Sequence, residues 1–342
     1  MTEPRRHLAL VTDAWEPQVN GVVRTYQEIV ERLRARGWRV TVIHPGEFRC
    51  KPLPSDPEIA YAWDVWPKLP RMLRALAPDC LHLATEGPLG MTARIWCGLH
   101  GYRFTSSFHT KFPEFILERM GIPLFWTYGL AKWFHNRAES TLVPTPSLLR
   151  YLESRGFNRC RPWTHGVDIE RFHPSRRREL DYPRPIALYV GRVSVEKNLE
   201  PFLSIKMPGT RLIVGDGPER AALEERYPEA HFLGVRTGEE LATLYASADV
   251  FVFPSRTDTF GLVLLEALAS GTPIAGYPVT GPIDIANDAA VGGIEEDLGK
   301  AIEHALACSR QDCRAYAEQM SWDEAERIFE ATLVPMRLPG QA

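Results

Sequence analysis

The sequence lacks any apolar run that approaches the roughly 18 residues required by a membrane-spanning helix. Its longest candidate covers residues 122–131 and is broken by Pro123, Thr127 and Gly129. Residues 1–11 contain two arginines, and their apolar stretch is too short for the core of a secretory signal. We therefore expect a chain that does not cross a bilayer and that carries no export signal at its start.

Cysteine patterns typical of metal sites are also missing. The six cysteines stand at positions 50, 80, 97, 160, 308 and 313, with no Cys-x-x-Cys pair and no histidine at zinc-finger spacing. Such scattered cysteines are typical of free thiols in a reducing compartment. We therefore expect a cytoplasmic protein with no metal and no other bound cofactor.

The chain has little excess charge of one sign, with a formal net charge of -3 at pH 7. Without a cationic field over the whole chain, no nucleic-acid partner is expected. The charge is unevenly divided, however: residues 1–178 hold 26 Lys and Arg against 17 Asp and Glu, whereas residues 179–342 hold 14 against 26. The first half is therefore net positive and the second half net negative.

Strand and helix patterns alternate along the 342 residues, a length greater than one hydrophobic core usually serves. In the first half we predict strands at 7–11, 39–43, 80–84, 103–108 and 141–143, and helices at 22–36, 88–99 and 124–137. In the second half we predict strands at 186–190, 211–214, 231–233, 250–253 and 273–275, and helices at 219–226, 239–247 and 261–270. This alternation predicts an α/β protein with a parallel, doubly wound sheet in each half.

The alternation stops between residues 165 and 185, where arginines and prolines replace the apolar periodicity. We place the domain junction in this stretch and expect two Rossmann-like domains, residues 1–170 and 171–315. Ligands of open parallel sheets bind beyond the carboxyl ends of the strands. The functional residues are therefore sought in the loops that follow the predicted strands.

The loop and helix after the strand at 250–253 carry the most informative spacing. Asp258 lies in the loop, and Glu266 follows eight residues later in the predicted helix. Eight steps of about 100° leave the two directions roughly 80° apart, so both carboxylates can reach one cleft, where they suit paired sugar hydroxyls. Taken alone, an aspartate at a helix start is more often an N-cap, and a lone helical glutamate is usually solvated. An anion is expected at the amides that we place at the helix start, those of Thr259, Phe260 and Gly261.

Together with other motifs, this segment resembles glycosyltransferase family 4, the retaining nucleotide-sugar transferases with the GT-B fold. The other motifs are, in order, Asn20-Gly21-Val22, His165-Gly166-Val167-Asp168 to Phe172-His173-Pro174, Val190-Gly191-Arg192 with Glu196-Lys197-Asn198, and Val214-Gly215-Asp216-Gly217-Pro218. The resemblance covers nearly the whole chain. It implies two Rossmann-like domains whose sheets face a cleft, and a C-terminal helix at about 316–335 that packs back onto the first domain.

The resemblance also implies a donor-binding role for residues of the second domain. Glu266 would bind the ribose, and Asp258, where the family usually has glutamate, would contact the transferred sugar. Arg192, which follows Gly191, and Lys197 would hold the diphosphate. Two fixed cations would stabilise the charge of the departing diphosphate without a metal. The loop after residues 231–234, with Leu233, would read the base, and the sequence leaves UDP and GDP equally open.

Two residues of the first domain complete the implied site. Gly21 would let the backbone approach the diphosphate, and His109 would contact the sugar near its anomeric carbon. In enzymes of this kind the departing phosphate oxygen accepts the proton of the acceptor, so His109 is not assigned as a general base. From the residues alone, Gly21 fits a simple turn equally well, and a single histidine such as His109 is more often structural.

Residues 115–138, in the positive half, combine aromatic and basic side chains. They include Phe115, Ile116, Leu117, Phe125, Trp126, Tyr128, Trp133 and Phe134, beside Arg119, Lys132 and Arg137. Such a mixture is typical of helices at a membrane interface, and it fits the core of two packed helices equally well. Both interpretations stay open.

Residues 144–147, 258–261 and 277–284 resemble the family branch with GDP-mannose-dependent mannosyltransferases, sulfoquinovosyl diacylglycerol synthases and bacterial diacylglycerol glycosyltransferases. This implies a peripheral hexosyltransferase that uses GDP-mannose or a UDP-hexose and glycosylates a membrane glycerolipid such as diacylglycerol at the inner leaflet of the plasma membrane. Two alternatives are a transferase that acts on a soluble sugar or small metabolite, and a protein that binds a nucleotide sugar without turnover.

Overall fold

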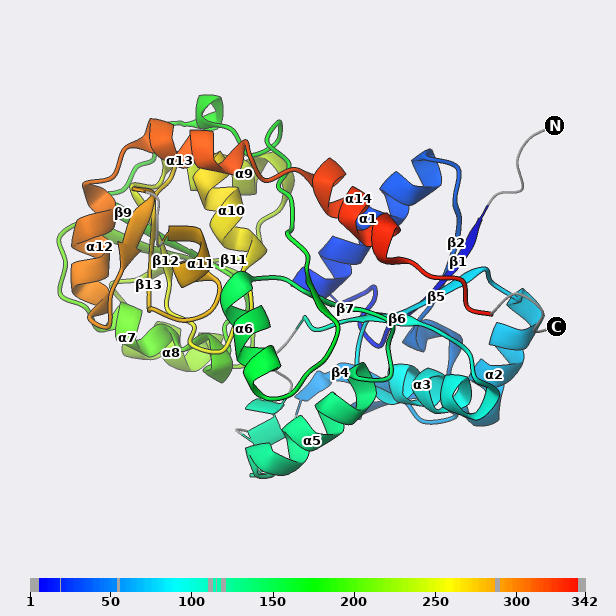
Figure 1. Ribbon diagram of the computed structural model, residues 1–342. Helices are drawn as coiled ribbons and strands as arrows, with labels where there is room; N and C mark the ends of the chain where they lie inside the picture. Colours follow the sequence, from blue (N-terminus) through cyan, green and yellow to red (C-terminus); the bar gives the residue numbers. More distant parts are fainter. Residues whose placement is uncertain are drawn as a thin grey trace. The chain divides into compact units, whose positions relative to one another are not determined.

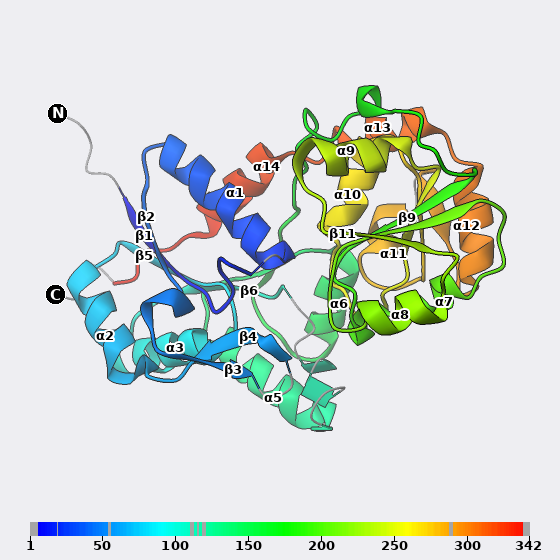
Figure 2. The same ribbon diagram turned by 180° about the vertical axis from the view of Figure 1, so that it is seen from behind.

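The computed structural model describes residues 6–18, 20–53, 56–109, 113–114, 116–117, 121–286 and 290–337. The chain divides into two compact units: unit 1 holds residues 1–164 and 323–342, and unit 2 holds residues 165–322. The unit boundaries thus lie a few residues from the domain limits at 170 and 315 expected from the sequence. Figures 1 and 2 show the helices and strands of both units.

Unit 1 contains a parallel sheet whose strand order in the described residues is β2-β1-β5-β6-β7-β8. The strands are β1 (His7–Val11), β2 (Arg39–Ile43), β5 (Cys80–Leu83), β6 (Thr105–Ser107), β7 (Thr141–Val143) and β8 (Cys160–Pro162). Its helices include α1 (Gly21–Ala35), α2 (Val65–Leu76), α3 (Pro88–His100), α5 (Leu124–His135) and α6 (Pro146–Ser154). The antiparallel strands β3 (Cys50–Leu53) and β4 (Asp56–Ala62) form a separate hairpin.

Successive side chains of a strand point to opposite faces of the sheet, and in this sheet both faces are covered by helices. Ala9 and Val11 of β1 pack in a cluster with residues of α2 and α3, whereas Leu8 and Leu10 point to the other face and are equally buried. In Figure 1, α2, α3 and α5 lie on one side of the strands, and α1 and α14 (Trp322–Thr332) lie on the other. A strand that is apolar on both faces requires this double cover.

The C-terminal helix α14 packs on α1 within unit 1. Arg36, the C-cap of α1, pairs with Glu326 at 2.6 Å, and the Trp38 indole N–H donates to Glu330 at 3.0 Å. The fully buried ring of Phe329 lies 4.8 Å from the imidazole of His82 on β5. The end of the chain therefore completes the core of the unit that its beginning builds.

Unit 2 repeats the architecture, with the strand order β11-β10-β9-β12-β13-β14 in the described residues. The strands are β9 (Ile186–Val190), β10 (Thr210–Val214), β11 (His231–Gly234), β12 (Val250–Phe253), β13 (Ile274–Gly276) and β14 (Gly292–Ile294). The helices are α7 (Leu199–Leu203), α8 (Arg220–Arg226), α9 (Gly238–Ser247), α10 (Leu262–Ala269), α11 (Pro282–Ala286), α12 (Leu298–Leu306) and α13 (Arg310–Ala317). All described strand pairs in this sheet are parallel.

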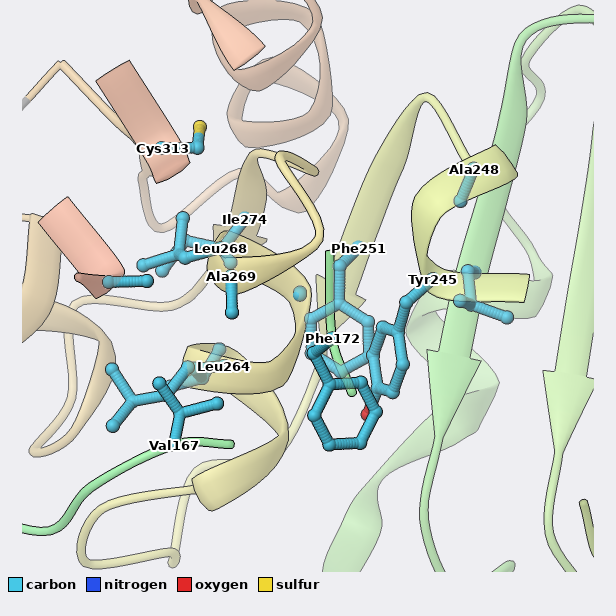
Figure 3. Packing of buried hydrophobic residues seen from close by; sticks show 14 of the residues in the cluster. Val167, Phe172, Tyr245, Ala248, Phe251, Leu264, Leu268, Ala269, Ile274 and Cys313 are labelled. Carbon is cyan, nitrogen blue, oxygen red and sulfur yellow. The ribbon is translucent and has the colours of Figure 1, made fainter. Parts of the chain in front are cut away.

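Two hydrophobic clusters cover the two faces of this second sheet. Ile186 and Leu188 of β9 join a cluster with α9, α10 and α13, part of which Figure 3 shows. Ala187 and Tyr189 point the other way and pack with α7, α8 and α12. The doubly wound arrangement predicted from the βα alternation is therefore confirmed in both units.

The structure contains several elements that were not predicted. They are the hairpin β3–β4, the strands β8 and β14, and the helices α2, α6, α7, α11, α12 and α13. Prolines 52 and 57 break the apolar pattern of the hairpin, and the edge strands β8 and β14 have three residues each. None of the helices within the described residues is both long and apolar enough to span a bilayer.

Replacing Phe329 by alanine tests the packing of α14. The ring is fully buried, so its removal leaves a cavity and should lower the free energy of unfolding by about 3 to 5 kcal/mol. The control is Phe125→Ala, because that ring is 79% exposed and its loss should cost less than about 0.5 kcal/mol. Urea titrations followed by tryptophan fluorescence compare the two variants. Equal losses would contradict the packing described here.

Candidate functional site

The predicted donor-binding residues of unit 2 gather at the carboxyl edge of its sheet. Strands β10, β9 and β12 are parallel neighbours, so the loops that follow them leave the sheet at the same edge. Gly191 and Arg192 follow β9, and the loop with Asp258 follows β12. The Tyr189 hydroxyl donates to the Arg192 carbonyl at 2.7 Å, which fixes the turn that presents the arginine.

Close backbone approach explains the glycine at position 215, at this edge. A Cβ on Gly215 would lie 1.8 Å from the Gly191 carbonyl oxygen, and the φ of Gly215 is +134°. Only glycine fits there, because any side chain would push the loops after β9 and β10 apart. Gly215 follows β10 directly, so the two loops are packed backbone to backbone.

Lys197 and Asp258 form the central ion pair of the site. The lysine ends a short 3-10 helix, Val195–Lys197, and its Nζ lies 2.7 and 2.8 Å from the two carboxylate oxygens of Asp258. Both side chains are 25% exposed, so the pair is reachable from solvent. The Asn198 amide donates to the Pro254 carbonyl at 3.0 Å, which ties the two loops together beneath the pair.

The second predicted cation, Arg192, lies 4.0 Å from the Glu196 carboxylate. The structure therefore places an acid beside each of the two basic residues that were predicted to hold a diphosphate. At Lys197 the acid is itself a predicted sugar-binding residue. A ligand with more negative charge than one carboxylate would compete with these acids for the cations.

Helix α10 begins later than predicted. Its first residue is Leu262, and Gly261 is the N-cap in a left-handed conformation with φ +85°. The prediction that the amides of Thr259, Phe260 and Gly261 open the helix is therefore wrong, because they precede its first turn. Phe260 instead stacks on His165, with ring centroids 4.8 Å apart. Thr259 and Phe260 are largely buried, and the β11 residue Leu233 is partly buried.

Glu266 is not a solvated helical glutamate. It lies within α10, is only 7% exposed and accepts a hydrogen bond from the Tyr245 hydroxyl at 2.9 Å. Tyr245 comes from α9, and Figure 3 shows its ring among the apolar side chains of the cluster. A buried carboxylate held by a buried phenol is a fixed hydrogen-bond acceptor. The described contacts thus give Asp258 and Glu266 different partners.

Gly21 and His109 occupy the carboxyl edge of the other sheet, that of unit 1. Gly21 is the first residue of α1, after the N-cap Asn20, whose side chain accepts from the Val23 amide at 3.0 Å. His109 follows β6, and its Nε2 lies 2.9 Å from the Tyr26 hydroxyl oxygen. Both residues therefore stand after parallel strands of their own unit.

Sequence reasoning missed Tyr245 and Tyr26, the hydroxyl partners of Glu266 and His109. Tyr245 lies 21 positions from Glu266, and Tyr26 lies 83 positions from His109. Both tyrosines are buried and follow the apolar periodicity of their helices, so their pattern indicates core residues only. Among the described residues, no group of three or more His, Cys, Asp or Glu side chains is placed to hold a metal ion.

Comparison with known proteins identifies the family. The Glycosyltransferase Family 4 model matches residues 19–171, and the Glycosyl transferases group 1 model matches residues 184–322. The GDP-mannose-dependent alpha-mannosyltransferase of Mycobacterium tuberculosis is 35% identical over 336 residues, 87% of each chain. The chain belongs to glycosyltransferase family 4. This family 4 glycosyltransferase is a hexosyltransferase that uses a nucleotide sugar.

Other relatives and solved structures agree with this assignment. The sulfoquinovosyl transferase SQD2 of Arabidopsis thaliana is 30% identical over 318 residues, 83% of this chain and 62% of that protein. The sucrose-phosphate synthase of Thermosynechococcus elongatus superposes with a TM-score of 0.76 at 20% identity, over 96% of this chain and 98% of that one. The GT-B fold predicted from the motifs is thereby confirmed.

Replacing Asp258 by asparagine tests the competition for Lys197. Without the carboxylate charge, a diphosphate no longer has to compete with Asp258 for the lysine. GDP or UDP should therefore bind about two- to fivefold more tightly, the magnitude expected for a partly exposed ion pair. Lys197→Ala should weaken the same binding. Isothermal titration calorimetry with each nucleotide measures both effects.

The control is Glu229→Gln, because Glu229 pairs with Arg211 near the start of β10, at the opposite edge of the sheet. This change should leave nucleotide affinity unaltered. Weaker binding in Asp258→Asn, comparable with Lys197→Ala, would show that Asp258 does not compete with the diphosphate.

Proposed function

We propose that this glycosyltransferase moves a hexose, with retention of anomeric configuration, from GDP-mannose or a UDP-hexose to a membrane glycerolipid such as diacylglycerol. The observation that carries the donor assignment is the solvent-reachable Lys197–Asp258 pair at the carboxyl edge of the unit 2 sheet. GDP-mannose is the first donor to test. Three relatives named GDP-mannose-dependent alpha-mannosyltransferases, at 35%, 32% and 33% identity, support this choice.

Binding of the donor separates the two ion pairs of the proposed site. The diphosphate takes Lys197 and Arg192, with its backbone contacts at Gly191. Asp258 is then free to accept hydrogen bonds from the sugar hydroxyls. The cations stabilise the negative charge that grows on the leaving diphosphate, so no divalent metal is required for this step.

The nucleoside binds beside the same loops in this proposal. Glu266, which the Tyr245 hydroxyl holds in place, accepts the paired hydroxyls of the ribose. The loop residues Thr259, Phe260 and Gly261 contact the donor through their backbone groups, and Leu233 lies at the strand end that reads the base.

Unit 1 supplies the reacting side of the sugar. Gly21 gives backbone access to the diphosphate at the start of α1, and His109 contacts the sugar near its anomeric carbon. The departing phosphate oxygen accepts the acceptor's proton, so that the new bond forms on the face that the phosphate leaves. This front-face course retains the configuration and needs no enzymic nucleophile.

The acceptor is inferred from one face of α5. Tyr128, Ala131 and Phe134 are buried in the core, whereas the opposite side of the helix is exposed. We name this exposed side the α5 face, formed by Phe125, Trp126, Leu130 and Trp133. In this proposal one side of α5 belongs to the core of unit 1, and the other side is the one that meets the membrane. Phe115 and Arg119 lie outside the described residues.

Cationic side chains extend the α5 face. Arg94 of α3 stacks 3.3 Å over the Trp133 ring, and its guanidinium donates to the Trp133 carbonyl at 2.9 Å. Lys132, on α5 itself, is exposed. Exposed aromatic rings beside cations suit the headgroup region of an anionic bilayer. This supports a lipid acceptor at the cytoplasmic leaflet.

A transfer assay tests the proposed reaction. The protein is incubated with labelled GDP-mannose, UDP-glucose or UDP-galactose and anionic vesicles that contain diacylglycerol. We expect label in the lipid phase with one donor, an α-linked product and the same rate in EDTA. Label only on an added soluble sugar would replace the lipid acceptor, and binding of every donor without transfer or hydrolysis would indicate a silent binding protein.

Serine replacements at Phe125, Trp126 and Trp133 test the α5 face. These changes remove apolar area that would enter the bilayer, so vesicle binding should weaken about tenfold or more. Serine replacements at Trp63 and Trp66 are the control, because these rings are as exposed but lie outside the α5 face. Vesicle co-sedimentation at low salt measures both. Equal binding of the two variants would contradict the proposed docking.

A further inference from the structure

A buried polar network lies behind His109. The phenol of Tyr26, on α1, is fully buried, and three groups lie within hydrogen-bond distance of its oxygen. These are the Ser107 Oγ at 2.8 Å, the His82 Nε2 at 2.9 Å and the His109 Nε2 at 2.9 Å. The strands β5 and β6 supply His82 and Ser107, so two strands of the unit 1 sheet meet the α1 phenol here.

The ring of His109 is also held by packing. It meets the Tyr26 ring edge-on at 5.1 Å and the Trp163 ring edge-on at 5.5 Å. Two aromatic contacts restrict the plane of the imidazole, and the hydrogen bond to Tyr26 restricts its rotation within that plane. The position of His109 is thus set by buried neighbours rather than by the loop that it begins.

The place of the phenol proton sets the direction of the hydrogen bond between Tyr26 and His109. A phenol has one proton to donate and two lone pairs with which to accept. With this proton donated to Ser107, the Tyr26 oxygen can only accept from the Nε2 of His109. In a neutral imidazole only one nitrogen bears a proton, so the lone pair then lies on Nδ1.

The remaining members of the network are neutral and consistent with this direction. Burial lowers the pKa of His82 to about 3, so its imidazole carries no charge at neutral pH. Burial also raises the pKa of Tyr26, which keeps the phenol protonated. His82 has a further partner, the Thr105 hydroxyl, at 2.8 Å from its Nδ1. The network can therefore hold a fixed set of protons over a wide pH range.

We propose that Tyr26 is a positioning residue that holds His109 as the Nε2–H tautomer, with the Nδ1 edge of the ring turned away from the phenol. The importance of this tautomer for transfer rests on the proposed function, in which His109 contacts the sugar. Tyr26 itself does not touch the donor. Because Tyr26 lies five residues after Gly21 on α1, one helix supports both unit 1 residues of the proposed site.

The tautomer is tested first in the ligand-free wild-type protein. Long-range ¹H–¹⁵N correlation spectra of ¹⁵N-histidine-labelled protein, assigned with His109→Gln, report which ring nitrogen carries the proton. We expect a protonated Nε2 in His109. Protonation on Nδ1 would overturn the proposal, and this readout depends on neither donor nor acceptor.

The variant Tyr26→Phe then removes only the hydroxyl. Ser107 and His82 remain 2.8 Å apart and can bond each other, so the buried network keeps partners. We expect a mixture of His109 tautomers and a turnover number lowered about three- to tenfold, the worth of one neutral hydrogen bond. The KM for the donor should stay unchanged, because Tyr26 does not contact it.

A matched control is Tyr128→Phe, which removes another hydroxyl of unit 1 that donates to Glu114 at 2.6 Å. It should change neither the His109 spectrum nor turnover. If Tyr26→Phe also leaves the tautomer and turnover as in the wild type, Tyr26 has no positioning role. If the tautomer shifts while turnover stays the same, the positioning role of Tyr26 stands and the role of His109 in the proposed function is wrong. If the wild type is inactive but shows the expected spectrum, the proposed function is wrong and the proposal for Tyr26 stands.

Discussion

The ion pair between Lys197 and Asp258 is the interaction on which the proposed donor site depends. It brings a residue predicted to bind phosphate within 2.7 Å of one predicted to bind sugar, in loops that follow different strands. A diphosphate carries more negative charge than a carboxylate and offers several acceptor oxygens, so it can take the lysine from Asp258. The same exchange would release a carboxylate for the sugar hydroxyls. Recognition of the two parts of the donor would then be coupled through one lysine.

The parallel sheet explains why residues so far apart in sequence can act together. In each unit the loops after neighbouring strands leave the sheet at one edge, and the glycines there allow these loops to touch. Gly215 is an example, because its Cα lies against the Gly191 carbonyl with no room for a side chain. The ion pair and the buried Glu266–Tyr245 bond are therefore properties of packed loops and helices, and no single motif contains them.

The sequence alone predicts the fold well because its signal is local. The strands at 7–11, 39–43, 186–190 and 250–253 have the predicted bounds, since continuous apolar runs flanked by turn residues specify buried strands. The site is predicted less completely. The spacing of Asp258 and Glu266 made both carboxylates candidates, but their partners depend on tertiary contacts with α9 and a 3-10 turn. The start of α10 was misplaced because Gly261 serves as its N-cap in a conformation that no pattern of apolar residues indicates.

Helix α5 shows why periodicity could not separate a core helix from an interfacial one. Both of its sides are apolar, and the division between them becomes visible only in the burial of each side chain. Tyr128 and Phe134 contribute to the core of unit 1, whereas Phe125, at 79% exposure, and Trp126, at 69%, bury little area on folding and so add little to stability. Their aromatic character is therefore not explained by the packing of the unit. Exposed aromatic rings on one side of a helix, with an arginine stacked on one of them, are typical of a surface that meets a partner, and the proposed lipid headgroup layer would satisfy both the apolar and the cationic side chains.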